Sequence, residues 1–298
     1  MKRWLAHILL LLVYSPVMAI GWRQTDVQLK HYLTFSTNGG YFSLLENIPE
    51  VETLGGGGAT LGIGYEMRYK HLWVGAALDV QYCFSSLNSP ANDIDRVVYD
   101  TQGKALTYHY HVRGYTDTQH DVRIGLPVLV GFYTNGIYGG VGIHASFAPF
   151  TVATPTVAYT TRGEYERYIN DFTNMPNHFY TEYTIRGRTE MKMLPQVSVI
   201  GEIGYDVLNK ERISQYRLCS VLKIAAYAEY GLLNSTTGSQ EVTDLFYVDT
   251  NNPIHLVPVG YYTCRDVRDK RIVPLLVGVK VTFMLRIKTP NCHCDGAI

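Results

Sequence analysis

The chain has 298 residues, with 26 basic and 26 acidic side chains and a formal net charge of zero. This balance argues against a nucleic-acid binder, which usually carries a basic excess, and a hydrophobic share of 46% excludes a disordered chain. Charged residues make up only 17%, against about 25% in an ordinary soluble domain, while 24 tyrosines and 27 glycines are both high.

The first segment has the layout of a secretory signal peptide. Lys2 and Arg3 precede a short apolar stretch, Pro16 breaks it, and small residues follow up to Ala19. We expect cleavage near Ala19, which removes residues 1–19 and exports the rest. The apolar stretch is short for a helix that spans a bilayer.

The rest of the chain is dominated by strict alternation of apolar with small or charged side chains. Such a period of two indicates β-strands whose two faces meet different environments. No comparably long segment has a helical period. The alternation predicts eight strands, at about residues 30–45, 59–69, 72–82, 122–132, 137–147, 197–207, 218–230 and 273–285.

Short and long connections alternate between these predicted strands. Lys70–His71 forms one short connection, and Asn135–Gly136 another, because both of its residues tolerate positive φ in a hairpin. The long connections cover residues 87–119, 149–193 and 231–271. An up-and-down barrel then has its short turns on one side and its long loops on the other, as outer-membrane barrels do. With an even number of strands, both termini fall on the periplasmic side.

The polar face of these strands favours a membrane barrel over a soluble one. It consists mostly of Gly, Ala, Ser and Thr with one or two charges per strand, and small residues suit the crowded inside of a narrow barrel. Aromatic side chains near the strand ends form the expected girdle: Tyr65, Tyr69, Tyr82, Phe132, Tyr205, Tyr230 and Phe283. We predict an all-β fold, an eight-stranded antiparallel up-and-down transmembrane β-barrel with long extracellular loops. It covers residues 20–289 and precedes a periplasmic tail at 290–298; a secreted soluble barrel or sandwich is the alternative.

Two runs carry a family resemblance. Residues 55–82, GGGGATLGIGYEMRYKHLWVGAALDVQY, and residues 121–132, DVRIGLPVLVGF, resemble consecutive strands of small outer-membrane β-barrel proteins of Bacteroidota, the PorT-like and general outer-membrane β-barrel families. The resemblance covers the strands and not the loops. It implies an integral protein of the bacterial outer membrane, in some relatives a component of envelope secretion machinery, and it assigns no catalytic residue.

If the apolar face meets lipid, the charged face points into the lumen. The lumen of an eight-stranded barrel is just wide enough to be filled by side chains, so matched charges there predict a plug of ion pairs and hydrogen bonds. A proton or small-ion path is the alternative. The predicted lumen residues are six acids and six bases, Glu66, Arg68, Asp79, Asp121, Arg123, Glu202, Asp206, Arg217, Lys223, Glu229, Lys280 and Arg286.

Two weaker patterns raise catalytic or metal chemistry. His144-Ala145-Ser146 resembles the His-x-Ser pair of outer-membrane lipid A deacylases, but both side chains are predicted to face the lumen and no matching carboxylate is identifiable. His109 and His111, with His120 nearby, share one face of an extended segment without a completing ligand. We predict no catalytic residue, no metal and no cofactor, with a lipid-modifying enzyme as the alternative.

The five cysteines leave pairing open. Cys83 and Cys219 are both expected to point inward but at opposite ends of the barrel, so they should not pair with each other. Cys264 in the last long loop is a possible partner for Cys83. Cys292 and Cys294 flank a histidine in the tail, where a short unstructured end is the first interpretation and a metal or redox role the second.

The long loops are the best candidates for function because they are rich in tyrosine. Tyrosine is enriched at protein interfaces, since one end is apolar and the other forms hydrogen bonds. The alternation continues into several loop flanks, so we expect strands to project above the membrane. We predict a non-enzymatic anchor or accessory subunit, in contact with outer-membrane lipid, that binds an envelope protein and no nucleic acid; a narrow channel and a variable, non-binding surface are alternatives. The binding candidates are Tyr108, Tyr110, Tyr165, Tyr168, Tyr180, Tyr183, Tyr261 and Tyr262.

Overall fold

The computed structural model describes most of the chain. The described residues are 29–46, 51–89, 92–99, 103, 105–165, 181–209, 220–235, 245–249, 254–263 and 271–287. The predicted signal peptide and periplasmic tail lie outside them. Within them no helix is long and apolar enough to cross a membrane.

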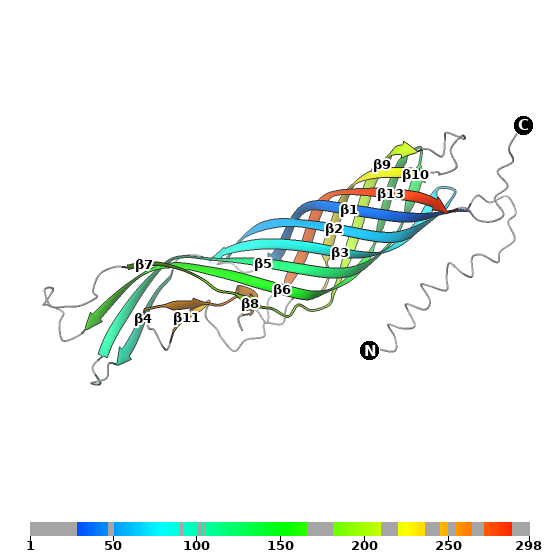
Figure 1. The fold of residues 1–298 in the computed structure, drawn as a ribbon. Coiled ribbons are helices and arrows are strands. Elements are labelled where there is room, and N and C mark those ends of the chain that lie inside the picture. The colour runs from blue at the N-terminus through cyan, green and yellow to red at the C-terminus, as the bar shows by residue number, and fades with distance from the viewer. Residues whose placement is uncertain are drawn as a thin grey trace, which may run out of the picture.

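Eight antiparallel strands form a ring (Figure 1). Each strand pairs with the next in chain order, and the last pairs with the first, so the fold is an up-and-down barrel. The predicted all-β, eight-stranded architecture is confirmed. The strands are β1 (Leu29–Glu46), β2 (Glu52–Tyr69), β3 (Leu72–Ser89), β5 (Ala105–Thr134), β6 (Ile137–Tyr165), β9 (Gln196–Asn209), β10 (Ser220–Gly231) and β13 (Ile272–Ile287).

The short turns follow the local sequence. The β2–β3 turn places Lys70 at φ 50°, and the β5–β6 turn places Asn135 and Gly136 at φ 49° and 91°. These are the positive values that a two-residue hairpin needs. At Asn38–Gly40, where we expected an interruption, β1 continues, because Gly40 lets the backbone of β13 approach: an added Cβ would lie 2.1 Å from the Val277 carbonyl oxygen.

The longest strands extend far beyond the predicted ones. β5 has 30 residues and β6 has 29, whereas crossing a bilayer takes about 9–11. Shorter strands from the long connections pair with this extension. They are β4 (Asn92–Tyr99), which pairs with β5, and β7 (Thr181–Arg186) and β8 (Thr189–Glu190), which pair with β6.

A separate hairpin from the last long connection completes this end of the molecule. It consists of β11 (Phe246–Val248) and β12 (Leu256–Pro258) and is followed by the 3₁₀ turn η4 (Tyr261–Thr263). We call β4, β7, β8, β11, β12, η4 and residues 105–119 and 152–165 of β5 and β6 the projecting module. Figure 1 shows it at the end of the barrel opposite the start of β1 and the end of β13.

The barrel wall separates an apolar outside from a polar inside. Leu61 and Val141 on its outer face are 69% and 63% exposed, while Glu66 and Arg123, on the opposite face of the same sheet, are buried. An ordinary soluble domain would place these residues the other way round. The projecting module has a conventional apolar core instead, so the molecule has two interiors of different chemistry.

Candidate functional site

The lower part of the lumen, next to the short β2–β3 turn, holds a four-residue ion-pair cluster from three strands. Lys223 on β10 donates to both carboxylate oxygens of Glu66 on β2, with Nζ at 2.9 and 2.8 Å. Arg68, two residues further along the same face of β2, donates from Nε to Glu66 Oε1 at 2.7 Å and lies 3.6 Å from Asp206 on β9. The cluster therefore ties three strands of the wall together across the lumen.

The cations of this cluster make cation–π contacts with aromatic rings. Lys223 Nζ lies 4.4 Å from the ring centroid of Tyr138 and 5.0 Å from that of Trp73. The Arg68 guanidinium lies 4.5 Å from the centroid of the Tyr133 ring. Cation–π contacts of this kind are strongest where water is excluded, and they replace part of the hydration that the buried cations have lost.

The middle of the lumen contains a second set of paired charges. Lys280 on β13 donates to Glu202 Oε2 on β9 at 2.7 Å. His144 on β6 lies between two carboxylates, with Nδ1 2.9 Å from Glu229 Oε1 and Nε2 3.2 Å from Asp79 Oδ1. The Tyr227 hydroxyl donates to the other Glu229 oxygen at 3.1 Å.

The two contacts of His144 have a chemical consequence. A neutral imidazole has one donor and one acceptor nitrogen, so it can satisfy two ionised carboxylates only as the imidazolium. As the imidazolium, His144 donates to Glu229 from Nδ1 and to Asp79 from Nε2. Because both ring nitrogens face carboxylates, His144 is not placed to accept a proton from Ser146, and the His-x-Ser pair has no base–nucleophile geometry.

The upper part of the lumen holds a third group of paired side chains. Arg123 Nη2 donates to Asp121 Oδ2 at 2.7 Å, and Gln119 Nε2 donates to Asp121 Oδ1 at 2.8 Å. The guanidinium lies 5.1 Å from the ring centroid of Phe42, which belongs to an apolar layer with the buried thiol of Cys83. The other four cysteines lie outside the described residues.

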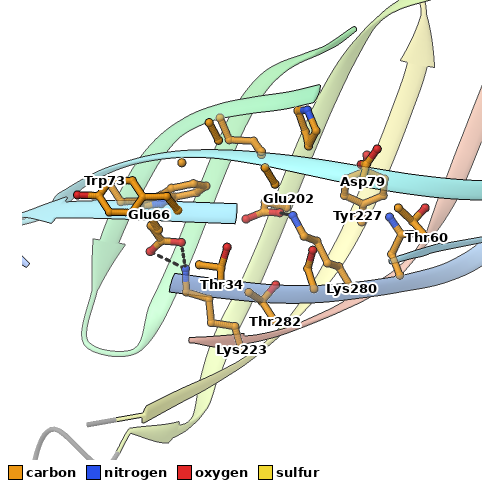
Figure 2. A pocket seen from close by; sticks show the side chains of 18 residues that line it. Thr34, Thr60, Glu66, Trp73, Asp79, Glu202, Lys223, Tyr227, Lys280 and Thr282 are labelled. Carbon is orange, nitrogen blue, oxygen red and sulfur yellow. Dashed lines mark hydrogen bonds and ion pairs between the residues drawn. The ribbon is translucent and has the colours of Figure 1, made fainter. Parts of the chain in front are cut away.

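Between the lower and middle charges lies a cavity of about 50 Å³ (Figure 2). Figure 2 shows the Lys223–Glu66 and Lys280–Glu202 pairs on its lining, with the hydroxyls of Thr34, Thr60 and Thr282 nearby. This volume holds about three water molecules. Thr60 Oγ1 and Asn38 Oδ1 are buried without a protein partner and belong to lining residues, so bound water fits the cavity.

Most of the predicted lumen residues are brought together. Ten of the twelve lie in the three groups just described; Arg217 lies outside the described residues, and Arg286 lies partly exposed near the end of β13. Our prediction did not count His144 among the charges, although its phase on the strand pointed inward. The missing signal was the position of Asp79 and Glu229, which are 65 and 85 residues away in sequence.

In the projecting module, tyrosines form the core rather than an exposed surface. Their rings follow one another across three strands: Tyr108 to Tyr110 at 6.1 Å, Tyr110 to Tyr159 at 6.2 Å, and Tyr159 to Tyr183 at 5.5 Å between centroids. Tyr159 also donates to the Ile254 carbonyl at 3.1 Å and accepts from the Leu256 amide at 3.1 Å. The row thus fastens the β11–β12 hairpin to the sheet.

The binding candidates therefore divide into groups. Tyr110, Tyr261 and Tyr262 are buried, so they stabilise the module and are not free to contact a partner, contrary to our expectation of exposed loop tyrosines. Tyr108 and Tyr183 are partly buried against the same core. Tyr168, Tyr180 and the side chain of Tyr165 lie outside the part of the chain that the structure describes.

The turn η4 caps the mouth of the barrel through Asp117. The Tyr261 amide donates to Asp117 Oδ2 at 2.8 Å, and the Tyr115 hydroxyl donates to the Val259 carbonyl. Burial raises the pKa of the Asp117 carboxyl to about 6, although the hydrogen bond from the Tyr261 amide lowers it. The cap is therefore held by a buried carboxyl group that is less stable there when it is ionised than when it is protonated.

We expect Asp117→Asn to change how the cap responds to pH. The pKa of Asp117 is raised from 3.8 to about 6. The docked cap is therefore most stable below pH 4, where the carboxyl is protonated in both states. Its stability decreases as the pH rises to 6, by up to about 3 kcal/mol. Asn keeps the acceptor for the Tyr261 amide and carries no charge. Amide exchange of residues 256–263 should be equally slow in both proteins at pH 4 and slower in the variant at pH 7.5. Asp95→Asn, at an exposed carboxylate, is the control, and an unchanged pH dependence in Asp117→Asn would contradict this role.

The three histidines considered as metal ligands each contact a different side chain. His109 contacts Asp95 at 2.7 Å, His111 contacts Asp93 at 2.6 Å, and His120 contacts the Tyr82 hydroxyl at 2.8 Å. Among the described residues no group of three or more His, Cys, Asp or Glu side chains is arranged to hold a metal ion.

Comparisons with known proteins give little beyond this geometry. No protein-family model matches the chain, and no curated protein matches it significantly. Among solved structures, the alignment with OccK1 (OpdK) of Pseudomonas aeruginosa covers 87% of this chain and 99% of that one, at 9% identity and a TM-score of 0.11. OccAB2 of Acinetobacter baumannii (88% and 98%) has 7% identity and a TM-score of 0.10, and a BenF-like porin of Pseudomonas fluorescens Pf-5 (87% and 99%) has 6% and 0.11. Scores this low establish no shared fold, so the barrel is argued from its strand pairing alone.

Proposed function

We propose that this protein is an integral, non-enzymatic β-barrel of the bacterial outer membrane that anchors the projecting module and binds an envelope protein through it. The observation that carries the proposal is the contrast between the two ends of β5 and β6. Their lower halves belong to a barrel filled with paired charges, and their upper halves support a module with its own apolar core.

The outer surface of the barrel supports the membrane location. The alternation on β3 runs over about the length that a tilted strand needs to cross a bilayer. Above it the outward side chains become polar, as in the Ser86–Thr118 hydrogen bond of 3.0 Å. Six of the seven predicted girdle aromatics are exposed, as lipid-interface residues would be. The outward side chains on β3 are Leu72, Val74, Ala76, Leu78, Val80, Tyr82 and Phe84.

The filled lumen argues for anchoring rather than transport. Three layers of paired charges obstruct it, the cavity of about 50 Å³ lies between two of them, and η4 binds Asp117 above them. We expect purified protein in planar bilayers to be silent. A conductance that changes in Arg123→Ala or Glu202→Ala would favour a narrow channel instead.

The direct test is purification of the tagged protein from its own outer membrane in mild detergent, with mass spectrometry of what accompanies it. We expect one stoichiometric envelope protein. Tyr159→Ala should release this partner, because it removes two of the hydrogen bonds that hold the β11–β12 hairpin against the sheet. The barrel should stay intact and heat-modifiable on gels, as in the control Lys192→Ala. A lone barrel, or a partner retained equally by both variants, would contradict the proposal.

A further inference from the structure

The strand β4 is an uncovered edge of the projecting sheet. It pairs over its whole length with β5, from Asn92 opposite Val112 to Tyr99 opposite Ala105, and among the described residues no strand pairs with its other side. The opposite edge of the module is different, because β7 lies beside the β11–β12 hairpin, where the Tyr183 ring meets His255 at 5.1 Å. The β4 edge therefore offers a row of backbone donors and acceptors, whereas the β7 edge, which among the described strands pairs with β6 alone, has the hairpin beside it.

The edge has only one of the features with which sheets usually prevent pairing. Natural edge strands carry charged side chains, Pro or a bulge, or they are very short; β4 has the charges alone, Asp93, Asp95 and Arg96, which restrict pairing to a strand of complementary charge. β4 has eight residues, NDIDRVVY, with neither Pro nor Lys, and its register with β5 shows no shift. Two contacts on its exposed face, Asp93 with His111 and Asp95 with His109, hold it against β5, so the edge is ordered before any partner arrives.

The side chains on this edge define a complementary partner. On one face two exposed carboxylates, Asp93 and Asp95, are followed by Val97 and Tyr99, which are 50% and 70% exposed. Each carboxylate contacts its histidine through Oδ1, and the Asp95 and Asp93 side chains stay 68% and 74% exposed. Arg96 is exposed on the opposite face. Opposite charges and apolar side chains across neighbouring strands stabilise a sheet.

We infer that the β4 edge binds an extended segment of a partner protein as an added antiparallel strand, with basic side chains opposite Asp93 and Asp95 and apolar ones opposite Val97 and Tyr99. Strand addition of this kind draws its affinity from main-chain hydrogen bonds and its specificity from alternate side chains. The inference rests on the proposed function and names the binding edge and the chemistry of the partner within it.

The test uses the full-length protein in detergent and a synthetic peptide as the probe. The peptide places Lys opposite Asp93 and Asp95, Ile opposite Val97, Val opposite Tyr99 and Glu opposite Arg96. Binding is measured by fluorescence anisotropy of the labelled peptide, and its location by hydrogen exchange of the backbone amides. We expect saturable binding that slows exchange in residues 92–99 and leaves residues 181–186 of β7 unchanged.

Charge matching is tested in the same assay. Asp93→Asn combined with Asp95→Asn should weaken binding roughly tenfold, because two cross-strand ion pairs are lost. A peptide with Thr in place of both Lys should bind the wild type and this variant equally. Glu182→Gln, at an exposed carboxylate on β7, is the matched control and should bind like the wild type.

Three results would overturn the inference. Slow exchange, without peptide, of the β4 amides that point away from β5 would show that another part of the chain already covers the edge, and protection of these amides that grows with protein concentration would identify a second copy as the occupant. Absence of peptide binding, or binding without protection of β4, would remove the edge as the site. The proposed function fails separately: if the native partner still copurifies and Tyr159→Ala releases it while the peptide does not bind, only the edge assignment is wrong.

Discussion

Replacing Lys223 with alanine is expected to lower the free energy of unfolding of the barrel by about 3–5 kcal/mol, the usual effect of removing one partner from a buried ion pair. Lys223 is buried and holds both carboxylate oxygens of Glu66. Its loss leaves Glu66 and Asp206 with Arg68 as the remaining cation of the cluster. The measurement is equilibrium unfolding by urea in lipid vesicles, followed by the fluorescence of Trp73.

Two controls separate this effect from a general loss of side-chain volume. Lys192→Ala, at an exposed position, should change the stability by less than about 0.5 kcal/mol. Glu66→Gln combined with Lys223→Met removes both charges of the pair and should recover much of the loss, because no unpaired carboxylate remains. If Lys223→Ala is as mild as Lys192→Ala, the lumen is more hydrated than the contacts indicate.

The second large effect is expected at Gly125, where strand β5 faces the contact between His144 and Asp79 in the middle of the lumen. A Cβ added there would lie 1.9 Å from His144 Nε2 and 2.6 Å from Asp79 Oδ1. Gly125→Ala therefore separates these two groups, and losing a charge-assisted contact in a buried site costs about 1.5–3 kcal/mol. Urea unfolding in vesicles should show this loss.

Gly114 provides a matched control on the same strand. A Cβ at Gly114 meets no other atom within 4 Å, so Gly114→Ala should leave the stability within about 0.5 kcal/mol of the wild type. Because the chemical change is identical at both positions, any difference reflects the neighbours of Gly125. Equal stability of the two variants would contradict the position of His144 between its carboxylates.

The alternation of side chains predicted the barrel well because it is a local property of each strand. In 59–69, for example, Leu61 and Ile63 face outward and Glu66 and Arg68 face inward, as their positions in the sequence require. The strand lengths were less predictable. Residues 105–121 also alternate, but with polar and aromatic residues, because this part of β5 lies above the apolar belt.

The contacts of the site join residues that are far apart in the sequence, and the local alternation does not predict which distant residues meet. Lys223 and Glu66 are 157 residues apart, so the prediction that matched charges would pair could not say which ones. The burial of Tyr110 depends likewise on the β11–β12 hairpin, which lies more than 130 residues further along the chain. Alternation showed that Tyr110 and His109 face opposite sides of the strand, but not which side another loop would cover.

The construction of the projecting module also sets an order of assembly. Its core joins residues from all three long connections, and the Tyr115–Val259 hydrogen bond spans 144 residues. The hairpin that completes this core directly precedes β13, the strand that closes the ring against β1. Contacts so distant in sequence form late in folding. Ring closure joins residues still further apart, such as His31 and Ile287, so the module and the closed ring both mature late, and a partner that recognised the module would distinguish finished barrels from incomplete ones.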